Sequence, residues 1–380
     1  MAHKRLRLLK QNFLKHTKVW PVVSLLGPRQ CGKSTFLRDL TWPKDTFTYL
    51  TLDNASTRRR AIENPELFLS ESERLPFVVD EIQKAPELFD EIKAVVDQKR
   101  VPGRFILSGS VQFSRKIGIR ESLTGRTATL YLDTLTLRES SQVKTLELKH
   151  IQQYMKLGGM PGVCFFRDSK IRTDYWEQWL ETLCERDLKT FSKGRLSGDL
   201  ARRILEQCAT LQLPMIQNIA KNTRIDARRI QTHIDALVDL FIVRPIQPHA
   251  GSTGKTIYIP FDCGLSSHLG AGMNRLWQVW FLVEWYNQRA FNFKQTVHPQ
   301  FYLTSRHSFV DFVTENTGHL FCGEPSPSRS YLMTAQAAAK KLSNKPFIIH
   351  CATNQSSHSV NKGIQALPWP QLTHFIDKTH

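Results

Sequence analysis

The chain has 380 residues, 41% hydrophobic and 23% charged, which is the composition of a globular protein with room for two or three separate cores. Lysine and arginine number 52 against 34 acidic residues, a formal charge of +18 at pH 7, and such a surface attracts polyanions. No apolar run approaches the length of a membrane span, so we expect no membrane among the partners. Nucleic acid is the partner that this charge favours, although an anionic membrane face, or a basic surface without a partner, is compatible with the charge alone.

The cysteines indicate a reducing compartment. There are seven, they are widely spaced, and none forms a CxxC pair. This pattern argues against a disulfide framework and against a zinc site, and the thirteen histidines show no HExxH spacing. We therefore expect a cytoplasmic protein.

The first eighteen residues carry six Lys or Arg and no acid, which superficially suggests a transit peptide. Leu6, Leu9 and Phe13 fall at helical spacing, however, and the first strand is expected to begin near Val19. Little would be left to cleave away. We interpret the segment as a basic amphipathic helix that belongs to the fold.

Short β-like runs alternate with helical segments from Val19 to about Leu137, an order that predicts βαβ units and a parallel sheet. The expected strands are VWPVVSLLG, FTYLTLD, LPFVVDE, RFILSGS and TATLYLDTL.

The first of these strands leads into a phosphate-binding motif. Residues 22–37 read VVSLLGPRQCGKSTFL and match G-x-x-x-x-G-K-[ST] between a strand and a helix. Backbone N–H groups of such a loop and the following helix N-terminus hold phosphate oxygens, and Lys33 can reach the β and γ phosphates. The residues expected to bind the nucleotide are Gly27, Pro28, Arg29, Gln30, Cys31, Gly32, Lys33, Ser34 and Thr35.

Hydrolysis needs an acidic pair, which LPFVVDE supplies at the end of its strand. Asp80 can hold Mg²⁺ through water, together with the Ser34 hydroxyl, and Glu81 can orient or deprotonate the attacking water. The alternative is that Asp80 and Glu81 are only a polar, solvent-exposed end of a strand without a catalytic role. We expect ATP and Mg²⁺ as cofactors and an ATPase as the activity.

Two further positions complete the expected catalytic set. Ser108, or Ser110 beside it, could contact the γ-phosphate or the water at the end of RFILSGS. Arg126, with Arg120 behind it, precedes the last strand and suits a finger offered to a neighbouring subunit's nucleotide. An arginine that pairs locally with an acid is the alternative.

These stretches together resemble a prokaryotic AAA+-type ATPase family with an AAA_14 domain and a C-terminal DUF4143 region. The resemblance rests on GPRQCGKST, YLTLDNASTRRRAIENPELFL, VVDEIQKAPELFDEIKAVVD and FILSGS…ESLTGR, and continues weakly through GGMPGV, RDL at Arg186–Leu188, YIPFDCGL, VDFV and ALPWPQL. It implies an α/β fold: a P-loop NTPase (AAA+) core with a helical lid, a winged-helix module and a C-terminal domain similar to the PD-(D/E)xK nucleases. It also implies Walker A at Gly27–Ser34, Walker B at Asp80 and Glu81, a polar sensor at Ser108 or Ser110, and an arginine finger at Arg126. Relatives of this class commonly form rings, often hexamers.

The middle of the chain has the pattern of a winged helix. A short helix is expected in LPMIQNIAKNTRI and a second in ARRIQTHIDALVD, capped by Asp226, before two strands joined through HAGSTGK. The second helix of such a module typically enters the major groove, so Arg228, Arg229 and Lys255 are the expected DNA contacts. Winged helices also mediate protein contacts, and this alternative stays open.

The C-terminal part departs from the nuclease pattern. Phe309 stands where an acid is expected two residues before Asp311, and FCGEPSPS offers no lysine. Asp311 and Glu284 alone make a poor metal-dependent phosphodiesterase site, so we expect a degenerate fold that binds or scaffolds without cutting. The tryptophans recur at helical intervals, which favours core packing over base stacking.

The sequence therefore predicts four parts: an ATPase core at 1–137, a helical lid at 138–197, a winged helix at 198–262 and a nuclease-like domain at 263–380. The leading hypothesis is an ATP hydrolase that couples turnover to remodelling of, or translocation on, duplex or branched DNA as a ring oligomer. The rival is an ATP-gated switch or scaffold that controls a protein partner, with DNA binding incidental.

Overall fold

The computed structural model describes residues 5–43, 45–71, 74–112, 123–141, 143, 145–291, 298–304, 308–355, 358–361 and 363–372. The chain divides into two compact units. One comprises the chain up to Leu135 with two short later segments, and the other comprises most of the chain from Thr136 onward.

The first unit is built on a five-stranded parallel sheet in the order β2-β3-β4-β1-β5, as the alternation of strands and helices predicted. Its strands are β1 (Val22–Leu26), β2 (Thr48–Thr51), β3 (Phe77–Asp80), β4 (Phe105–Gly109) and β5 (Thr127–Tyr131). Its helical segments are α1 (Leu9–Thr17), α2 (Lys33–Thr35), the π-helical turn η1 (Phe36–Thr41), α3 (Ala55–Glu63), α4 (Pro65–Ser70), the short η2 (Ile82–Lys84) and α5 (Leu88–Gln98).

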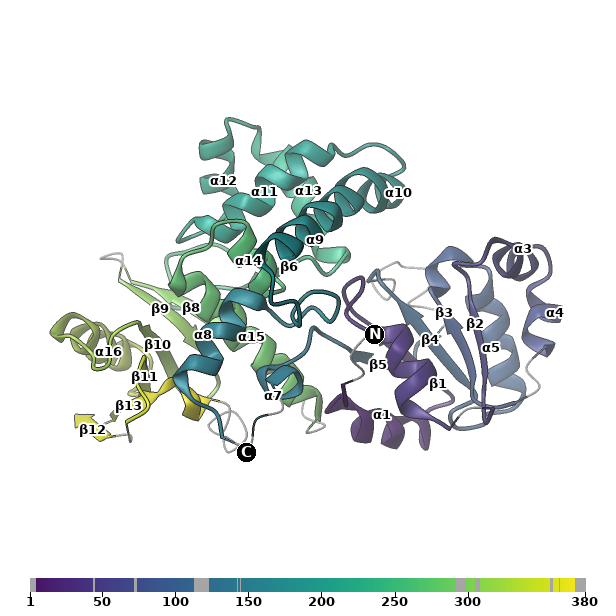
Figure 1. The fold of residues 1–380 in the computed structure, drawn as a ribbon, viewed down its shortest axis with the longest axis horizontal. Helices are drawn as coiled ribbons and strands as arrows, with labels where there is room; N and C mark the ends of the chain where they lie inside the picture. Colours follow the sequence, from purple (N-terminus) through teal and green to yellow (C-terminus); the bar gives the residue numbers. More distant parts are fainter. Residues whose placement is uncertain are drawn as a thin grey trace. The chain divides into compact units, whose positions relative to one another are not determined.

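Helices cover both faces of this sheet, which explains why its central strands are apolar throughout. Alternate residues of a strand point to opposite faces. Val22 and Leu26 of β1 pack in a cluster with residues of α3, α4 and α5, whereas Val23 and Leu25 pack with α1 and η1 (Figure 1). Because both faces are covered, β1, β3 and β4 are buried at every position.

The N-terminal helix belongs to the fold as expected, but one of its three predicted apolar positions is wrong. Leu9 and Phe13 are buried against the sheet. Leu6 precedes the first turn of α1 and is 72% exposed. Helical spacing alone cannot show that the helix begins three residues later.

The second unit begins with helices, which the stretch GGMPG interrupts. They are α7 (Leu137–Ser141), α8 (Leu148–Leu157), α9 (Ser169–Glu181), the π-helical η4 (Thr182–Asp187) and α10 (Leu188–Ser192). The glycine-rich break lies between α8 and α9, where Gly158 adopts φ +72°.

Three helices and a strand pair follow. They are α11 (Gly198–Thr210), α12 (Ile216–Thr223), α13 (Ala227–Asp239), β6 (Val243–Ile246) and β7 (Ile257–Pro260). The Asp226 side chain accepts a hydrogen bond from the Arg228 N–H at 2.9 Å, as expected for a helix cap. The two predicted helices and the predicted antiparallel hairpin are thereby confirmed as elements. We call α11–β7 the helix–hairpin module.

The loop of this hairpin packs against another strand, which the sequence did not indicate. His249 donates its N–H to the Phe301 carbonyl at 2.8 Å, and Thr253 donates to the Leu303 carbonyl at 3.2 Å. The Ser252 hydroxyl in turn accepts the Leu303 N–H at 3.0 Å. Both partners belong to β8 (Gln300–Leu303) of the C-terminal sheet. The hairpin loop is therefore held along its length by backbone contacts.

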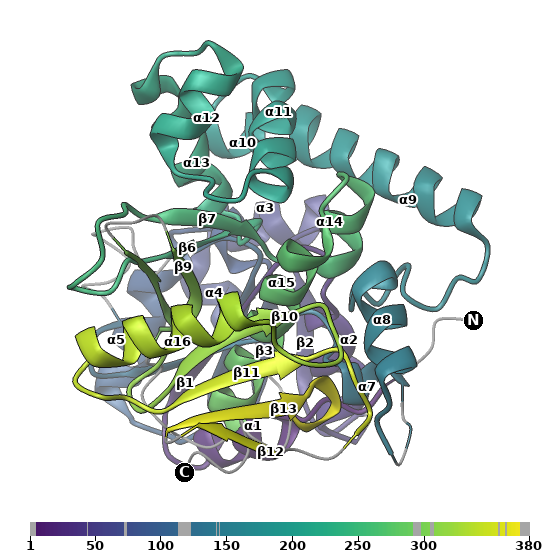
Figure 2. The same cartoon turned by 90° about the vertical axis from the view of Figure 1, so that its left-hand side faces the viewer.

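The C-terminal part is a mixed sheet in the order β12-β13-β11-β10-β9-β8. Its elements are α14 (Cys263–His268), α15 (Met273–Phe291), β8, β9 (Phe309–Val313), β10 (Gly318–Cys322), α16 (Arg329–Lys341), β11 (Phe347–Cys351), β12 (His358–Asn361), β13 (Ile364–Pro368) and the short η5 (Trp369–Gln371). Neighbours β8, β9 and β10 run antiparallel, whereas β10, β11 and β13 run parallel. Helix α16 lies across one face (Figure 2), and α15 packs on the other.

Aromatic residues fill the α15 side of this sheet. Trp277 stacks on Phe312, and Phe281 stacks on Phe312 and Trp285. Trp176 and Trp179 of α9 are also buried. The prediction that the tryptophans pack in cores is confirmed at Trp176, Trp179, Trp277, Trp280 and Trp285, which are all buried.

One hydrophobic cluster joins the parts of the second unit. It contains residues of α8, the hairpin isoleucines Ile246, Ile257 and Ile259, and the aromatic face of α15. The three predicted segments, a lid, a winged helix and a nuclease-like domain, thus share one core. Their division into separate domains remains a prediction.

A buried carboxylate ties two of the quoted motifs together. Asp262 of YIPFDCGL accepts the N–H of Gly159 in GGMPG at 2.9 Å, and the N–H groups of Gly264 and Leu265 at 2.7 and 3.1 Å. A Cβ on Gly158 would lie 2.2 Å from an Asp262 oxygen, so this position needs glycine. These motifs serve the architecture of the second unit.

Candidate nucleotide site

The phosphate loop connects β1 to α2 at the carboxyl edge of the parallel sheet. Gly32 adopts φ +101°, a conformation that favours glycine. A Cβ on Gly27 would lie 2.0 Å from the Leu132 carbonyl oxygen, so the loop can pack against the chain after β5 only with glycine there. Both motif glycines therefore have a steric reason.

Lys33 lies inside this loop. Its ammonium donates to the carbonyl oxygens of Gly27 and Pro28 at 3.0 and 2.8 Å, and its side chain is buried. The lysine thus sits at the centre of the turn whose N–H groups would surround a phosphate. Of the other predicted nucleotide contacts, Arg29 and Thr35 are half-buried and Gln30 is exposed.

Arg7 supports the loop from the N-terminal segment, a contact that sequence reasoning missed. It is 6% exposed and donates to the Cys31 carbonyl at 3.0 Å and the Asp133 carbonyl at 2.6 Å. Burial raises the pKa of the Cys31 thiol, whose Sγ lies 3.2 Å from the Leu132 carbonyl oxygen. Arg7 and the Leu132 carbonyl therefore hold the phosphate loop through Cys31.

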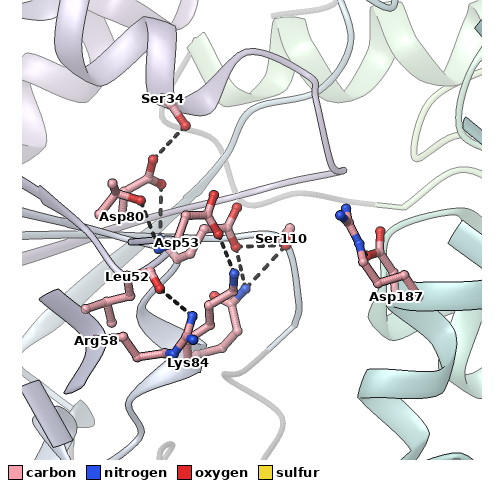
Figure 3. Close-up of polar contacts among 12 residues, drawn as sticks. Ser34, Leu52, Asp53, Arg58, Asp80, Lys84, Ser110 and Asp187 are labelled. Atoms are coloured by element: carbon pink, nitrogen blue, oxygen red, sulfur yellow. Dashed lines mark hydrogen bonds and ion pairs between the residues drawn. The ribbon is translucent and has the colours of Figure 1, made fainter. Parts of the chain in front are cut away.

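Asp80, at the end of β3, collects hydrogen-bond donors from three elements. The Ser34 hydroxyl donates to Oδ2 at 2.6 Å (Figure 3), and the Glu81 N–H donates to Oδ1 at 3.1 Å. The hydroxyls of Tyr49 and Ser108 also donate to this carboxylate. Burial first, and then the Asp80 charge, raise the pKa of Tyr49, so its phenol stays protonated as a donor. Tyr49 was not singled out from the sequence.

Glu81 follows in an unusual backbone conformation. Its φ is +59°, which directs the chain sharply into η2, and its Oε2 accepts hydrogen bonds from Ser110 at 3.0 Å and from Gln83. The structure thus separates the two serines that the sequence left as alternatives: Ser108 contacts Asp80 and Ser110 contacts Glu81.

The donor set suits magnesium. Ser34 Oγ and Asp80 Oδ2 lie next to each other beside the phosphate loop, and both are oxygens, which Mg²⁺ prefers. Mg²⁺ is usually held in this way by one or two protein oxygens together with substrate phosphates. Ser34 and Asp80 are therefore the residues that would hold the ion.

Comparison with known families decides the class of this unit. Residues 19–141 match the AAA_14 family model, described as an AAA domain. The first unit is an AAA-type ATPase domain. Residues 148–269 match a second model, DUF8612, a domain of unknown function, and this match covers the helices and the hairpin that follow the ATPase domain. The DUF4143 region that the resemblance implied stays a prediction.

Two curated relatives are uncharacterized proteins of Mycobacterium bovis and Mycobacterium tuberculosis, each 30% identical over 239 residues. The match takes in 62% of this chain and 52% of either relative, so the chain spans about half the length of the curated relatives it matches.

Solved structures with some likeness include the Walker-type ATPase of Pyrococcus abyssi, with a TM-score of 0.43, 15% identity, and coverage of 69% of this chain and 94% of that one. Another is the Aeropyrum pernix ORC1 protein in complex with DNA, with a TM-score of 0.32, 14% identity, and coverage of 70% and 93%. At TM-scores below 0.5, neither defines the fold or the function of this chain.

Arg126 lies at the other edge of the ATPase domain's sheet. Its carbonyl accepts the Val22 N–H at the amino end of β1, whereas the phosphate loop follows the carboxyl end. Five strand residues at about 3.3 Å each separate the two edges by roughly 16 Å. Its guanidinium makes a two-pronged ion pair with Asp97 of α5, at 2.6 and 2.8 Å. Arg120 lies outside the described residues.

The predicted DNA contacts lie on the helix–hairpin module. Arg228 and Arg229 are exposed at the first turn of α13, and Lys255 is exposed at the end of the hairpin loop that packs against β8. The module thus presents the two arginines on one helix end.

Asp311 and Glu284 are buried and serve different partners. Asp311 accepts hydrogen bonds from Gln278 and from the Phe321 N–H, both at 2.9 Å, and burial raises its pKa to about 6. Glu284 accepts the Leu137 N–H at 2.8 Å and contacts the Trp280 indole, and burial raises its pKa to about 7. Both are engaged inside the protein. No helix among the described residues is long and apolar enough to cross a membrane.

Proposed function

We propose that this ATPase couples ATP hydrolysis to work on DNA, remodelling duplex or branched DNA or translocating along it. The observation that carries the proposal is the pair of exposed arginines at the start of α13, on a helix–hairpin module in the same chain as the ATPase domain. The formal charge of +18 supports it.

In the ATPase domain the proposed roles follow from position. Lys33 neutralises the β and γ phosphates, Ser34 and Asp80 hold Mg²⁺, and Glu81 orients or deprotonates the attacking water. Ser108 fixes the Asp80 carboxylate through its hydroxyl. The bound ion would supply charge stabilisation of the phosphates, and the side chains supply its position.

The order of α11, α12, α13, β6 and β7 supports a winged helix. Met215, just before α12, makes an antiparallel bridge to Ile257, so a third short segment adds to the hairpin. In such modules the second of the two predicted helices, here α13, enters the major groove. Arg228, Arg229 and Lys255 would then contact phosphates or base edges.

DNA-stimulated ATP hydrolysis tests the proposal. The wild-type protein should hydrolyse ATP faster with duplex or branched DNA, and its DNA affinity should fall steeply with salt, because bound phosphates release counterions. Substituting Arg228 and Arg229 together by alanine should weaken binding and lower the salt slope by about two. Lys340→Ala with Lys341→Ala, which removes two exposed charges from α16, is the matched control.

Absence of both DNA stimulation and DNA binding would favour the rival, an ATP-gated switch that controls a protein partner. If the α16 control weakens DNA binding as much as the α13 variant does, binding depends on overall charge. The assignment of Arg228 and Arg229 as the DNA-binding surface would then be wrong.

A ring oligomer, with a hexamer as the expected state, is the proposed assembly. Arg126 is the proposed finger, because it lies at the edge of the sheet opposite to its own phosphate loop and could therefore act only on a neighbour's nucleotide. The ion pair with Asp97 would have to open for this role. Mass measurement in solution with a slowly hydrolysed ATP analogue tests the assembly.

The C-terminal part is proposed to be a non-cutting relative of the PD-(D/E)xK fold. Helix α15, the antiparallel strands β8–β10, helix α16 and the parallel strand β11 support this order. Asp311 is held by Gln278 and by backbone, so its oxygens are already engaged. Supercoiled DNA with Mg²⁺ or Mn²⁺ should stay intact, and nicking that Asp311→Ala abolishes would contradict the proposal.

A further inference from the structure

The Glu81 side chain is held by donors from two separate segments. Ser110, just after β4, donates its hydroxyl to Oε2 at 3.0 Å, and the amide of Gln83 in η2 donates to the same oxygen. The Gln83 amide also lies 3.3 Å from the Ser110 hydroxyl, so the three groups form a closed triangle. Figure 3 shows Ser110 and its contacts at this edge of the sheet.

Both donors converge on one oxygen of the carboxylate. Oε2 is engaged twice, and within the described part of the chain no hydrogen bond is made to Oε1. The backbone contributes as well, because Glu81 is held at φ +59° between β3 and η2. The carboxylate is therefore fixed at its base, by the backbone, and at its tip, by the two donors.

We propose that Gln83 and Ser110 are positioning residues for ATP hydrolysis: together they clamp Oε2 of Glu81 and leave Oε1 to accept a proton from the attacking water. This inference rests on the proposed role of Glu81. We call the pair the Glu81 clamp.

The clamp answers a specific need of the reaction. A glutamate side chain has three rotatable bonds, and a base that samples several rotamers spends little time in line with the water and the γ-phosphate. A displacement of about 1 Å can lower a rate by about a hundredfold. Two donors on one oxygen hold the rotamer, while the other oxygen keeps its lone pairs for the water.

Gln83→Leu and Ser110→Ala each remove one donor and keep the approximate shape. Each should lower kcat for ATP about tenfold and leave both KM and the dissociation constant for ATP within about twofold, because neither residue contacts Lys33, Ser34 or Asp80. Ser110→Thr keeps the hydroxyl and should retain most of the turnover. Lys84→Gln is the matched control, since Lys84 lies next to Gln83 in η2 but pairs with Asp53.

The same substitutions in a Glu81→Gln background distinguish the proposed clamp from the proposed role of Glu81 on which it rests. Glu81→Gln alone should keep ATP binding and lose at least about a hundredfold in turnover. Adding Gln83→Leu should then lower the residual single-turnover rate no further, because the clamp acts through Glu81.

Each other outcome has a distinct meaning. Full turnover by Glu81→Gln would refute the proposed role of Glu81, and the clamp with it. Loss in Glu81→Gln with normal turnover in Gln83→Leu and Ser110→Ala would refute the clamp alone. The clamp is also refuted if Gln83→Leu weakens ATP binding as much as it lowers kcat. It is refuted as well if Gln83→Leu lowers the residual rate of Glu81→Gln by the same factor as it lowers kcat of the wild-type protein.

Discussion

Substituting Asp262 by alanine should destabilise the second unit far more than an ordinary helix-cap substitution. Asp262 is fully buried and accepts three backbone N–H groups, from Gly159, Gly264 and Leu265. Hydrogen bonds to charged groups contribute about 1.5–3 kcal/mol each, and a donor left buried without a partner costs about 1–3 kcal/mol. Because the three losses overlap, we expect a decrease of roughly 3–5 kcal/mol in the free energy of unfolding.

Urea and thermal unfolding followed by tryptophan fluorescence measure this loss, since Trp179 stacks on the neighbouring Phe261 with ring centroids 5.7 Å apart. For a unit of this size, each kcal/mol lowers Tm by about 2–4 °C, so a shift of about 10 °C is expected. ATP should raise the transition of the ATPase domain, which distinguishes the two transitions.

Asp168→Ala is the matched control for this experiment. Asp168 caps α9 through the N–H groups of Lys170 and Ile171, but it is exposed, and loss of such a cap costs about 1 kcal/mol. If Asp262→Ala costs no more than Asp168→Ala, the interpretation of Asp262 as the group that ties the glycine-rich break to α14 is refuted.

Three further predictions concern the ATPase domain and one the C-terminal sheet. Lys33→Ala should abolish ATP binding measured at equilibrium. Tyr49→Phe should leave ATP binding intact but raise the Mg²⁺ concentration needed for half-maximal turnover a few-fold, because Asp80, the proposed Mg²⁺-binding carboxylate, loses one hydrogen-bond donor. Measured by phosphate release, ATP turnover should fall in Arg126→Ala and should be preserved or raised in Asp97→Asn. Normal ATP hydrolysis by an Arg126→Ala monomer would refute the assignment of Arg126 as an arginine finger. Burial lowers the pKa of His319 to about 3, below its ordinary value of 6.5. The folded state therefore binds fewer protons than the unfolded state, and stability falls as pH drops from 6.5 toward 3, by about 1.4 kcal/mol per pH unit. His319→Phe should flatten the unfolding free-energy profile by that slope, and an unchanged slope would contradict the burial argument.

The ATPase domain was predictable because its signals are local. The spacing of Gly27, Gly32, Lys33 and Ser34 names the loop, and an apolar strand before Asp80 places the acidic pair at the same edge of a parallel sheet. The parallel order then follows from the alternation of strands and helices.

The supporting contacts in that domain were not predictable. Arg7 reaches the loop across 24 residues, Tyr49 reaches Asp80 from β2, and Gln83 turns back to Glu81 only because of a left-handed backbone residue. Each is an ordinary residue type in the sequence. Tertiary geometry alone makes it a partner.

The second unit shows the same limit at a larger scale. Periodicity predicted the helices and the hairpin, but periodicity carries no information about which apolar faces share a core. The packing of the hairpin loop on β8, and of Ile246 and Ile257 with the α15 aromatics, appears only in the structure.

The opposed positions of Arg126 and the phosphate loop have a consequence for how the enzyme would respond to dilution. If Arg126 completes the nucleotide site of a neighbouring chain, each working catalytic centre contains residues of two chains. On dilution the concentration of such centres then falls faster than the concentration of the protein. An agent that occupies the outer surface around Asp97 would then silence hydrolysis without competing with ATP.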